Sequence, residues 1–126
     1  MKANELMIGD WVFCEGQPIP SNVTIQSIAE DGVWFMGDKV EGAATFDRIF
    51  PIPLTPEILE KNGFSFQNWW RIENGNPTIY LAEHYGSWWL YQDDYLDTRE
   101  YFAKIKYVHE LQHALRLCGI DKEITI

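Results

Sequence analysis

The chain has 126 residues, of which 46% are hydrophobic and 15% aromatic. This composition excludes intrinsic disorder, and the length suits a single domain with a real core. The formal net charge of −9 argues against a protein that binds nucleic acid through its phosphates, so we expect no nucleic-acid partner.

The cysteine count and the absence of long apolar stretches predict a cytoplasmic protein. Cys14 and Cys118 lie far apart and lack the spacing of a metal site, which favours free thiols in a reducing compartment. No hydrophobic run follows the Met-Lys start, so no signal peptide is visible. No stretch approaches the ~20 apolar residues that span a bilayer, and we expect no membrane partner.

The first half of the chain predicts a small, strongly bent β-sheet. The pattern Leu6-x-x-Gly9-Asp10-x-Val12 is a common entry to the first strand of an SH3-like barrel. Asp31-Gly32 is a favoured tight-turn pair, and two prolines make 17–22 a loop. Alternating apolar residues predict strands over 11–14, 23–28, 33–36 and 44–50.

The second half predicts a helix, a meander and a second helix. Thr55 and Pro56 start the first helix, and Gly63 ends it. The final helix has an apolar stripe and ends at Gly119, with Ile120 folding back onto Leu115. The strands between them are predicted over 68–73, 78–82, 87–91 and 101–106, with a turn at 74–77 and a further short strand at 123–126.

The expected fold class is therefore α+β. We expect one domain over 1–126, with a β-rich SH3-like part at 1–53. The part at 54–126 would contain the short helix and an antiparallel meander packed on the C-terminal helix. The sequence leaves open whether the two parts share one core.

The final helix carries His109-Glu110-x-x-His113, a pattern typical of zinc hydrolases. Histidines four apart lie on one face of a helix, as two zinc ligands must, and Glu110 would be the general base. Such a site needs a third protein ligand, and nothing in the sequence places distant His84 there. We favour two histidines with a packing role. We therefore expect no metal, no cofactor and no catalytic residue, and a zinc-dependent hydrolase is the alternative.

The aromatic strands of the second half are apolar on both faces, and this pattern has more than one explanation. Successive strand residues point to opposite faces, so Trp69 and Trp70 face opposite ways, as do Trp88 and Trp89. Each strand is apolar on both sides, whereas a solvated antiparallel sheet has one polar face. We favour simple core as the main explanation, with a binding or dimer surface formed by Trp69, Trp89 and Tyr91 as the alternative. A second alternative is a carbohydrate-binding surface, on which sugar rings stack against Trp69 or Trp89.

Three stretches together resemble a family of small uncharacterised proteins found in genomes, prophages and conjugative elements of gut anaerobes. They are the opening at 4–12, the central segment at 51–64, and Tyr107 to Gln112 with Gly119 closing the helix. The resemblance implies no activity. It also implies that members of the family often have Gln at position 110 and Asn at position 113. The helix would then be a structural signature of the family, which became His-Glu-x-x-His here through two local changes.

These patterns predict a non-enzymatic accessory protein of a mobile element, which acts by binding another protein. The partner is unknown, and a homodimer through the aromatic sheet face is a further expectation. The alternatives are the zinc-dependent hydrolase and a carbohydrate-binding module that uses strand tryptophans.

Overall fold

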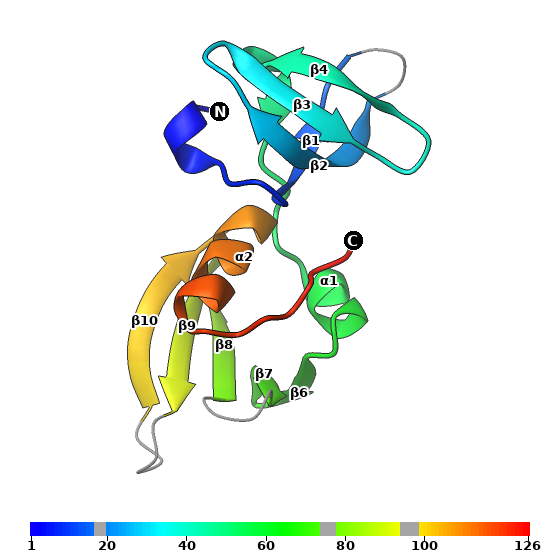
Figure 1. The fold of residues 1–126 in the computed structure, drawn as a ribbon. Helices are drawn as coiled ribbons and strands as arrows, with labels where there is room; N and C mark the ends of the chain where they lie inside the picture. Colours follow the sequence, from blue (N-terminus) through cyan, green and yellow to red (C-terminus); the bar gives the residue numbers. More distant parts are fainter. Residues whose placement is uncertain (17–19, 74–77, 94–98) are drawn as a thin grey trace. The chain divides into compact units, whose positions relative to one another are not determined.

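The structure, a computed structural model, is a mixed α+β fold with two antiparallel sheets and two α-helices (Figure 1). It describes residues 1–16, 20–73, 78–93 and 99–126. The chain forms two compact units. The first consists of 1–53 with 107–109, and the second of 54–106 with 110–126. The α+β class predicted from the sequence is confirmed.

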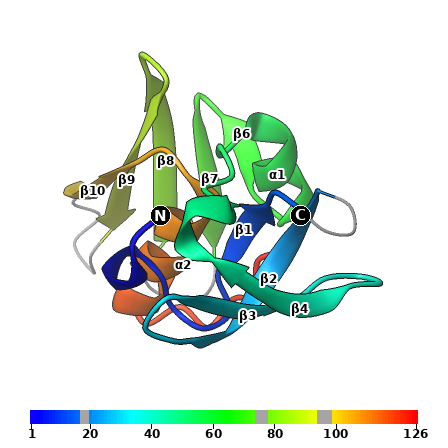
Figure 2. The ribbon, with the colours of Figure 1, turned by 90° about the horizontal axis from the view of Figure 1, so that it is seen from above.

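The first unit is a five-stranded sheet that bends into half a barrel (Figures 1 and 2). The strand order is β4-β3-β2-β1-β5, and every pair is antiparallel. Its elements are the 3-10 helix η1 (Ala3–Glu5), β1 (Trp11–Cys14), β2 (Ser21–Ile28), β3 (Gly32–Met36), β4 (Glu41–Thr45), the 3-10 helix η2 (Phe46–Arg48) and β5 (Ile49–Phe50).

The single strand expected over 44–50 is instead two strands separated by η2. The Thr45 hydroxyl donates to the Asp47 carboxylate in the exposed turn that begins η2. Short polar side chains that bond to a neighbour two residues away stabilise turns at the expense of strands. The apolar pattern of this stretch does not reveal that competition. The loop expected at 17–22 is shorter, because β2 already begins at Ser21, and 17–19 lie outside the described residues.

Alternation builds the core of the first unit, with one irregularity in β2 between Ile25 and Ser27. Val12, Val23, Ile25 and Ile49 are fully buried on one face of the sheet. Trp34, on the opposite face of β3, is exposed. Burial on one face fixes the register, because a slip by one residue would move every apolar side chain to the wrong side.

Gly32 is required where β3 leaves its hairpin turn. The Ala29 amide donates to the Gly32 carbonyl at 2.8 Å, which closes the turn. A Cβ at Gly32 would lie 2.2 Å from the Ala44 carbonyl oxygen of the paired strand. That oxygen belongs to the backbone, so it cannot turn away as a side chain could.

We therefore expect Gly32→Ala to lower the free energy of unfolding by about 2 kcal/mol, since β3 and β4 must separate to admit the methyl group. Gly42→Ala is the matched control on β4, because its Cβ would meet Phe35 at an ordinary 3.5 Å. Urea denaturation followed by circular dichroism measures both. Equal stability of the two variants would contradict the close approach.

The second unit contains a five-stranded meander, in the order β10-β9-β8-β7-β6. Both expected helices are present, and so are the strands expected over 68–73, 78–82, 87–91 and 101–106, whereas the one expected at 123–126 is not. The turn expected at 74–77 lies outside the described residues. The sequence did not predict β6, whose three residues are too few to show a period. The elements are α1 (Pro56–Lys61), β6 (Ser65–Gln67), β7 (Trp69–Glu73), β8 (Thr78–His84), β9 (Ser87–Asp93), β10 (Arg99–Ile105) and α2 (Val108–Leu117).

Both α-helices end at a glycine with a positive φ, as the sequence predicted. Gly63 and Gly119 have φ of +86° and +75°. In α2 the Ile120 amide donates to the Leu115 carbonyl at 2.9 Å, and Ile120 is buried. This is the Schellman geometry, in which a left-handed residue lets the chain satisfy the last carbonyls.

In the part of the chain that the structure describes, no helix has the length and apolar composition to cross a membrane.

Asn62, at the end of α1, holds the C-terminal segment. Its buried amide donates to the Ile58 carbonyl at 2.8 Å and to the Thr125 carbonyl at 2.7 Å. Its oxygen accepts from the Thr125 amide at 2.8 Å. One side chain thus pairs with both backbone groups of Thr125, as a neighbouring strand would. The strand expected at 123–126 does not form, and Asn62 takes the place of a partner strand.

Asn62→Ala is expected to lower the free energy of unfolding by about 2 kcal/mol, because three partly buried hydrogen bonds of the Asn62 side chain are lost. Hydrogen exchange of the amides at 123–126 should also accelerate. Asn22→Ala, at an exposed position of β2, is the control and should leave both quantities unchanged. An Asn62 variant with a protected C-terminal segment would contradict this role.

Candidate functional site

The second sheet has one apolar buried face and one aromatic face. Ile79, Leu81 and Leu90 are fully buried, and Trp88 is 2% exposed. Trp89 points the other way and is half-buried. The predicted opposite orientation of Trp88 and Trp89 therefore agrees with their burial.

Strand register brings the aromatic side chains together on the second face. Tyr80 of β8 pairs with Tyr91 of β9, and Tyr91 pairs with Tyr101 of β10. Side chains of paired residues lie side by side on the same face of a sheet. The aromatic face is defined by six rings from four strands: Trp69, Tyr80, His84, Trp89, Tyr91 and Tyr101.

The six rings form one continuous chain of contacts. Trp69 lies 6.3 Å from Tyr80 and 5.2 Å from Tyr91, between ring centroids. Tyr101 lies 5.8 Å from Tyr91 and 5.4 Å from Trp89. The His84 ring completes the series at 5.6 Å from Trp89. Most of these pairs are edge-to-face, an arrangement that stabilises aromatic rings and fixes their orientation.

Polar groups are interspersed with the rings. The Tyr80 hydroxyl donates to the Asp93 carboxylate at 2.8 Å. The Arg71 guanidinium lies 3.3 Å from the Glu73 carboxylate, both on the same side of β7 as Trp69. A surface of aromatic bodies with polar tips is typical of a protein-binding face.

The three binding residues proposed from the sequence all lie in the aromatic face. Trp69 contacts Tyr91 directly, and Trp89 is joined to them through Tyr101. Sequence reasoning did not select Tyr80, Tyr101 or His84. Counting alternate positions along each strand would have found them once the pairing was known, but pairing is not visible in the sequence.

A hollow of about 480 Å³ adjoins the aromatic face and shares two of its residues, Trp69 and His84. We call it the edge hollow, since it lies where β6, β7 and the ends of β8 and β9 meet. It is lined by Pro56, Phe66, Asn68, Trp69, Trp70, Leu81, Ala82, Glu83, His84 and Trp88.

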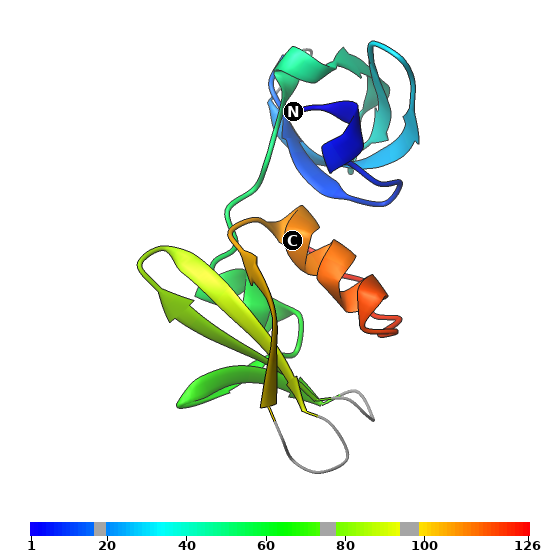
Figure 3. The same cartoon turned by 90° about the vertical axis from the view of Figure 1, so that its left-hand side faces the viewer.

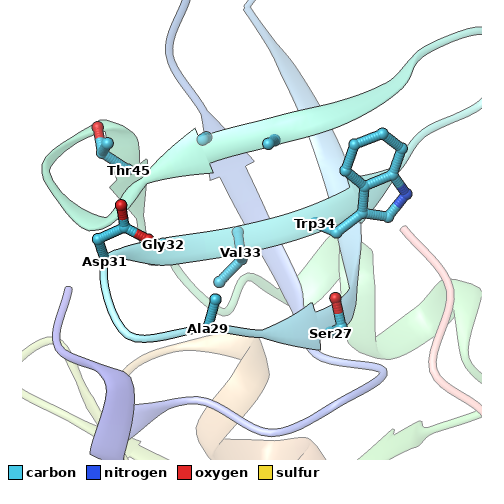
Figure 4. A pocket seen from close by; sticks show the side chains of 9 residues that line it. Ser27, Ala29, Asp31, Gly32, Val33, Trp34 and Thr45 are labelled. Atoms are coloured by element: carbon cyan, nitrogen blue, oxygen red, sulfur yellow. The ribbon is translucent and has the colours of Figure 1, made fainter.

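A smaller hollow of about 310 Å³ lies on the first unit, over β3 and β4. Figure 4 shows the Trp34 indole at one end and Asp31 with Thr45 at the other. Its middle is lined by small residues, Gly32 and two alanines of β4. Asp31 is the one ionisable group in its described lining, so the hollow brings no catalytic set together.

Two residues of the His109-Glu110-x-x-His113 motif, His109 and Glu110, contact neighbouring residues at the start of α2. His109 is 5% exposed and stacks on Tyr107, with centroids 5.9 Å apart and ring planes 14° apart. Glu110 accepts a hydrogen bond from the Lys106 amide at 2.9 Å. A carboxylate in the first turn that bonds to a preceding amide caps a helix. Within the described ranges, no group of three His, Cys, Asp or Glu residues is placed to bind a metal ion.

Burial raises the pKa of both thiols. Cys14 is buried in the core of the first unit, and desolvation raises its pKa, opposed in part by the charge of Arg48. Half-buried Cys118 also has a raised pKa because of desolvation. A raised pKa keeps a thiol protonated at neutral pH and weakens it as a nucleophile.

Comparison of the chain with protein-family models, curated proteins and solved structures found no match. The resemblance to the family from mobile elements of gut anaerobes stays a prediction.

Glu110→Ala is expected to lower the free energy of unfolding by about 1 kcal/mol, because the cap of α2 is lost. Glu110→Gln keeps an acceptor oxygen and should cost less than half as much. Urea denaturation of the two variants measures the difference. A general base without a structural role would leave both variants as stable as the wild type.

The wild type and a His113→Asn variant test the zinc alternative. Elemental analysis of the untagged wild type and of His113→Asn is expected to find no stoichiometric zinc and equal folding. About one zinc per chain, lost in His113→Asn, would instead establish a metal site.

Proposed function

We propose that this protein is a non-enzymatic binding protein that recognises another protein through the aromatic face. The observation that carries the proposal is the chain of six contacting rings across four strands, opposite the buried face of the sheet. A sheet needs one apolar face for its core, so a second face rich in Trp and Tyr requires another explanation.

The chemistry of the face fits a protein better than a sugar. Tyr and Trp supply a large contact area with few rotatable bonds, and the ring contacts fix that geometry before binding. A sugar-binding platform needs at least one fully exposed Trp beside polar groups. Trp69 and Trp89 are both half-buried by neighbouring rings, which favours a protein partner.

Tyr85 at the β8–β9 turn supports the proposal. Its φ is +51°, a left-handed conformation that is costly for a bulky residue and cheap for Gly or Asn. The side chain is fully exposed, so no packing compensates for this cost. Strain that stability does not explain is characteristic of functional positions. Tyr85 follows His84, so it presents a ring at the end of the aromatic face.

We propose two finer features of the fold. The first unit is SH3-like, which is supported by its bent sheet and by the Gly9-Asp10 turn that precedes β1. There the Asp10 carboxylate accepts from the Met7 amide at 2.8 Å. The second is that α2 packs on the buried face of the meander. It is supported by the burial of Leu111 and Leu115 and by the position of α2 on one side of the strands in Figure 3.

We also propose that the protein is an accessory of a mobile element. This part rests on the resemblance of the opening, central and final stretches. An accessory protein that works by binding needs a recognition surface and no catalytic set.

The test is affinity capture of partners from the source cells with wild-type protein, Tyr101→Ser and Tyr85→Asn. Tyr101 is 54% exposed, so its replacement should not unfold the sheet. Tyr85→Asn relieves the strained turn and should raise the free energy of unfolding by about 0.5 kcal/mol. We expect both variants to lose at least about tenfold in affinity for the captured partner, which binds the purified wild type.

Trp34→Ser is the matched control, since it removes a 46% exposed aromatic ring from the first unit. It should bind the partner as the wild type does. Analytical ultracentrifugation of each protein separates a foreign partner from a second copy. Partner binding that survives both aromatic-face variants, or is lost equally in Trp34→Ser, would contradict the proposal.

A further inference from the structure

The edge hollow combines aromatic walls with one carboxylate. Phe66 is 60% exposed, and its ring lies 5.3 Å from that of Trp70. Trp69 and Trp88 line the same hollow. The Trp88 indole N–H donates to the Leu54 carbonyl at 3.1 Å, so its hydrogen-bonding group is already used and the ring serves as apolar wall.

Glu83 supplies the charge. It pairs with Trp88 across β8 and β9, so both side chains lie on one face of the sheet. Glu83 is exposed, and within the described residues no salt bridge joins it. No lysine or arginine is among the described residues that line the hollow. Among its described lining residues, the hollow therefore has a carboxylate and no lysine or arginine to match it.

Aromatic rings and a carboxylate together select a cation. The face of an indole or phenyl ring attracts a positive charge through its quadrupole, and the attraction strengthens when the site is partly desolvated. A carboxylate beside the rings adds direct Coulomb attraction. An anion would be repelled by Glu83 and by the net charge of −9, and a neutral apolar group would leave the carboxylate without compensation.

We propose that the edge hollow binds a cationic side chain, lysine or arginine, of the partner protein. The inference rests on the proposed function and specifies the partner as one with a basic segment. Continuity supports it, because Trp69 and His84 belong both to the hollow and to the aromatic face. Glu83 points to the opposite face, as Trp88 does, so the hollow lies at the edge of the sheet between the two faces. A segment on the aromatic face would reach it by passing around this edge.

The test uses tetramethylammonium chloride as the probe on the full chain. Binding is followed by the indole N–H signals in heteronuclear NMR, with Trp69 and Trp70 assigned by single Trp→Phe substitutions. Sodium chloride at equal ionic strength controls for salt, and neopentyl alcohol is a neutral molecule of similar shape. We expect saturable shifts at Trp69 and Trp70 with tetramethylammonium alone.

Glu83→Gln removes the charge and keeps the shape of the side chain. We expect it to weaken tetramethylammonium binding about fivefold. Glu41→Gln makes the same change at an exposed strand position of the first unit and should leave binding unchanged. Equal shifts with neopentyl alcohol, no saturable shift, or equal binding by Glu83→Gln and wild type would each overturn the proposal.

The two proposals can fail separately. Loss of partner binding in Tyr101→Ser, together with no tetramethylammonium binding, would overturn the cation site and leave the aromatic face. Tetramethylammonium binding that depends on Glu83, with partner binding indifferent to Tyr101 and Tyr85, would overturn the proposed function and leave a cation site of other use.

Discussion

Alternation along the strands of the second sheet is the constraint on which its chemistry depends. Adjacent residues point to opposite faces, so burying Trp88 for the core forces Trp89 onto the other side. The same rule places Leu81 inside and Tyr80 among the aromatic rings. The aromatic face is therefore aligned by the core behind it, and a change of register would disturb both faces together.

Local patterns predicted the parts of the fold that local interactions determine. Gly63 and Gly119 end their helices through hydrogen bonds to carbonyls a few residues earlier, so short sequences are sufficient to identify them. The orientation of Trp88 and Trp89 follows from alternation alone. The Asn62 side-chain amide donates to the carbonyl of Thr125, which is 63 residues further along the chain. Nothing in the sequence near either residue indicates that hydrogen bond.

The aromatic face was only partly predictable for the same reason. Trp69, Trp89 and Tyr91 could be selected because Trp-Trp pairs on strands are conspicuous. Tyr101 joins them through register across β9 and β10, which includes an irregularity between Tyr101 and Ala103. A one-residue irregularity reverses the face of every later side chain, and it has no sequence signal of its own.

The helix motif shows why spacing alone does not establish chemistry. Residues four apart on a helix share a face whether they bind a metal or pack against neighbours. Glu110 bonds to the Lys106 amide, and His109 stacks on Tyr107, so each side chain has a role that needs no metal. A capping acid in the first turn is an ordinary feature of a short helix, so Glu110 at this position needs no catalytic explanation.

The β8–β9 hairpin contributes both to the core of the second unit and to the proposed recognition surface. Its strands contribute Leu81, Trp88 and Leu90 to the core, while its end carries Glu83, His84 and Tyr85. A hairpin optimised for stability alone would place Asn or Gly at position 85, because either accepts a left-handed φ at lower cost. The firm anchoring of the strands lets the turn tolerate that strain. His84 points to the aromatic face and Glu83 to the opposite face, so the end of the hairpin presents groups on both sides of the sheet.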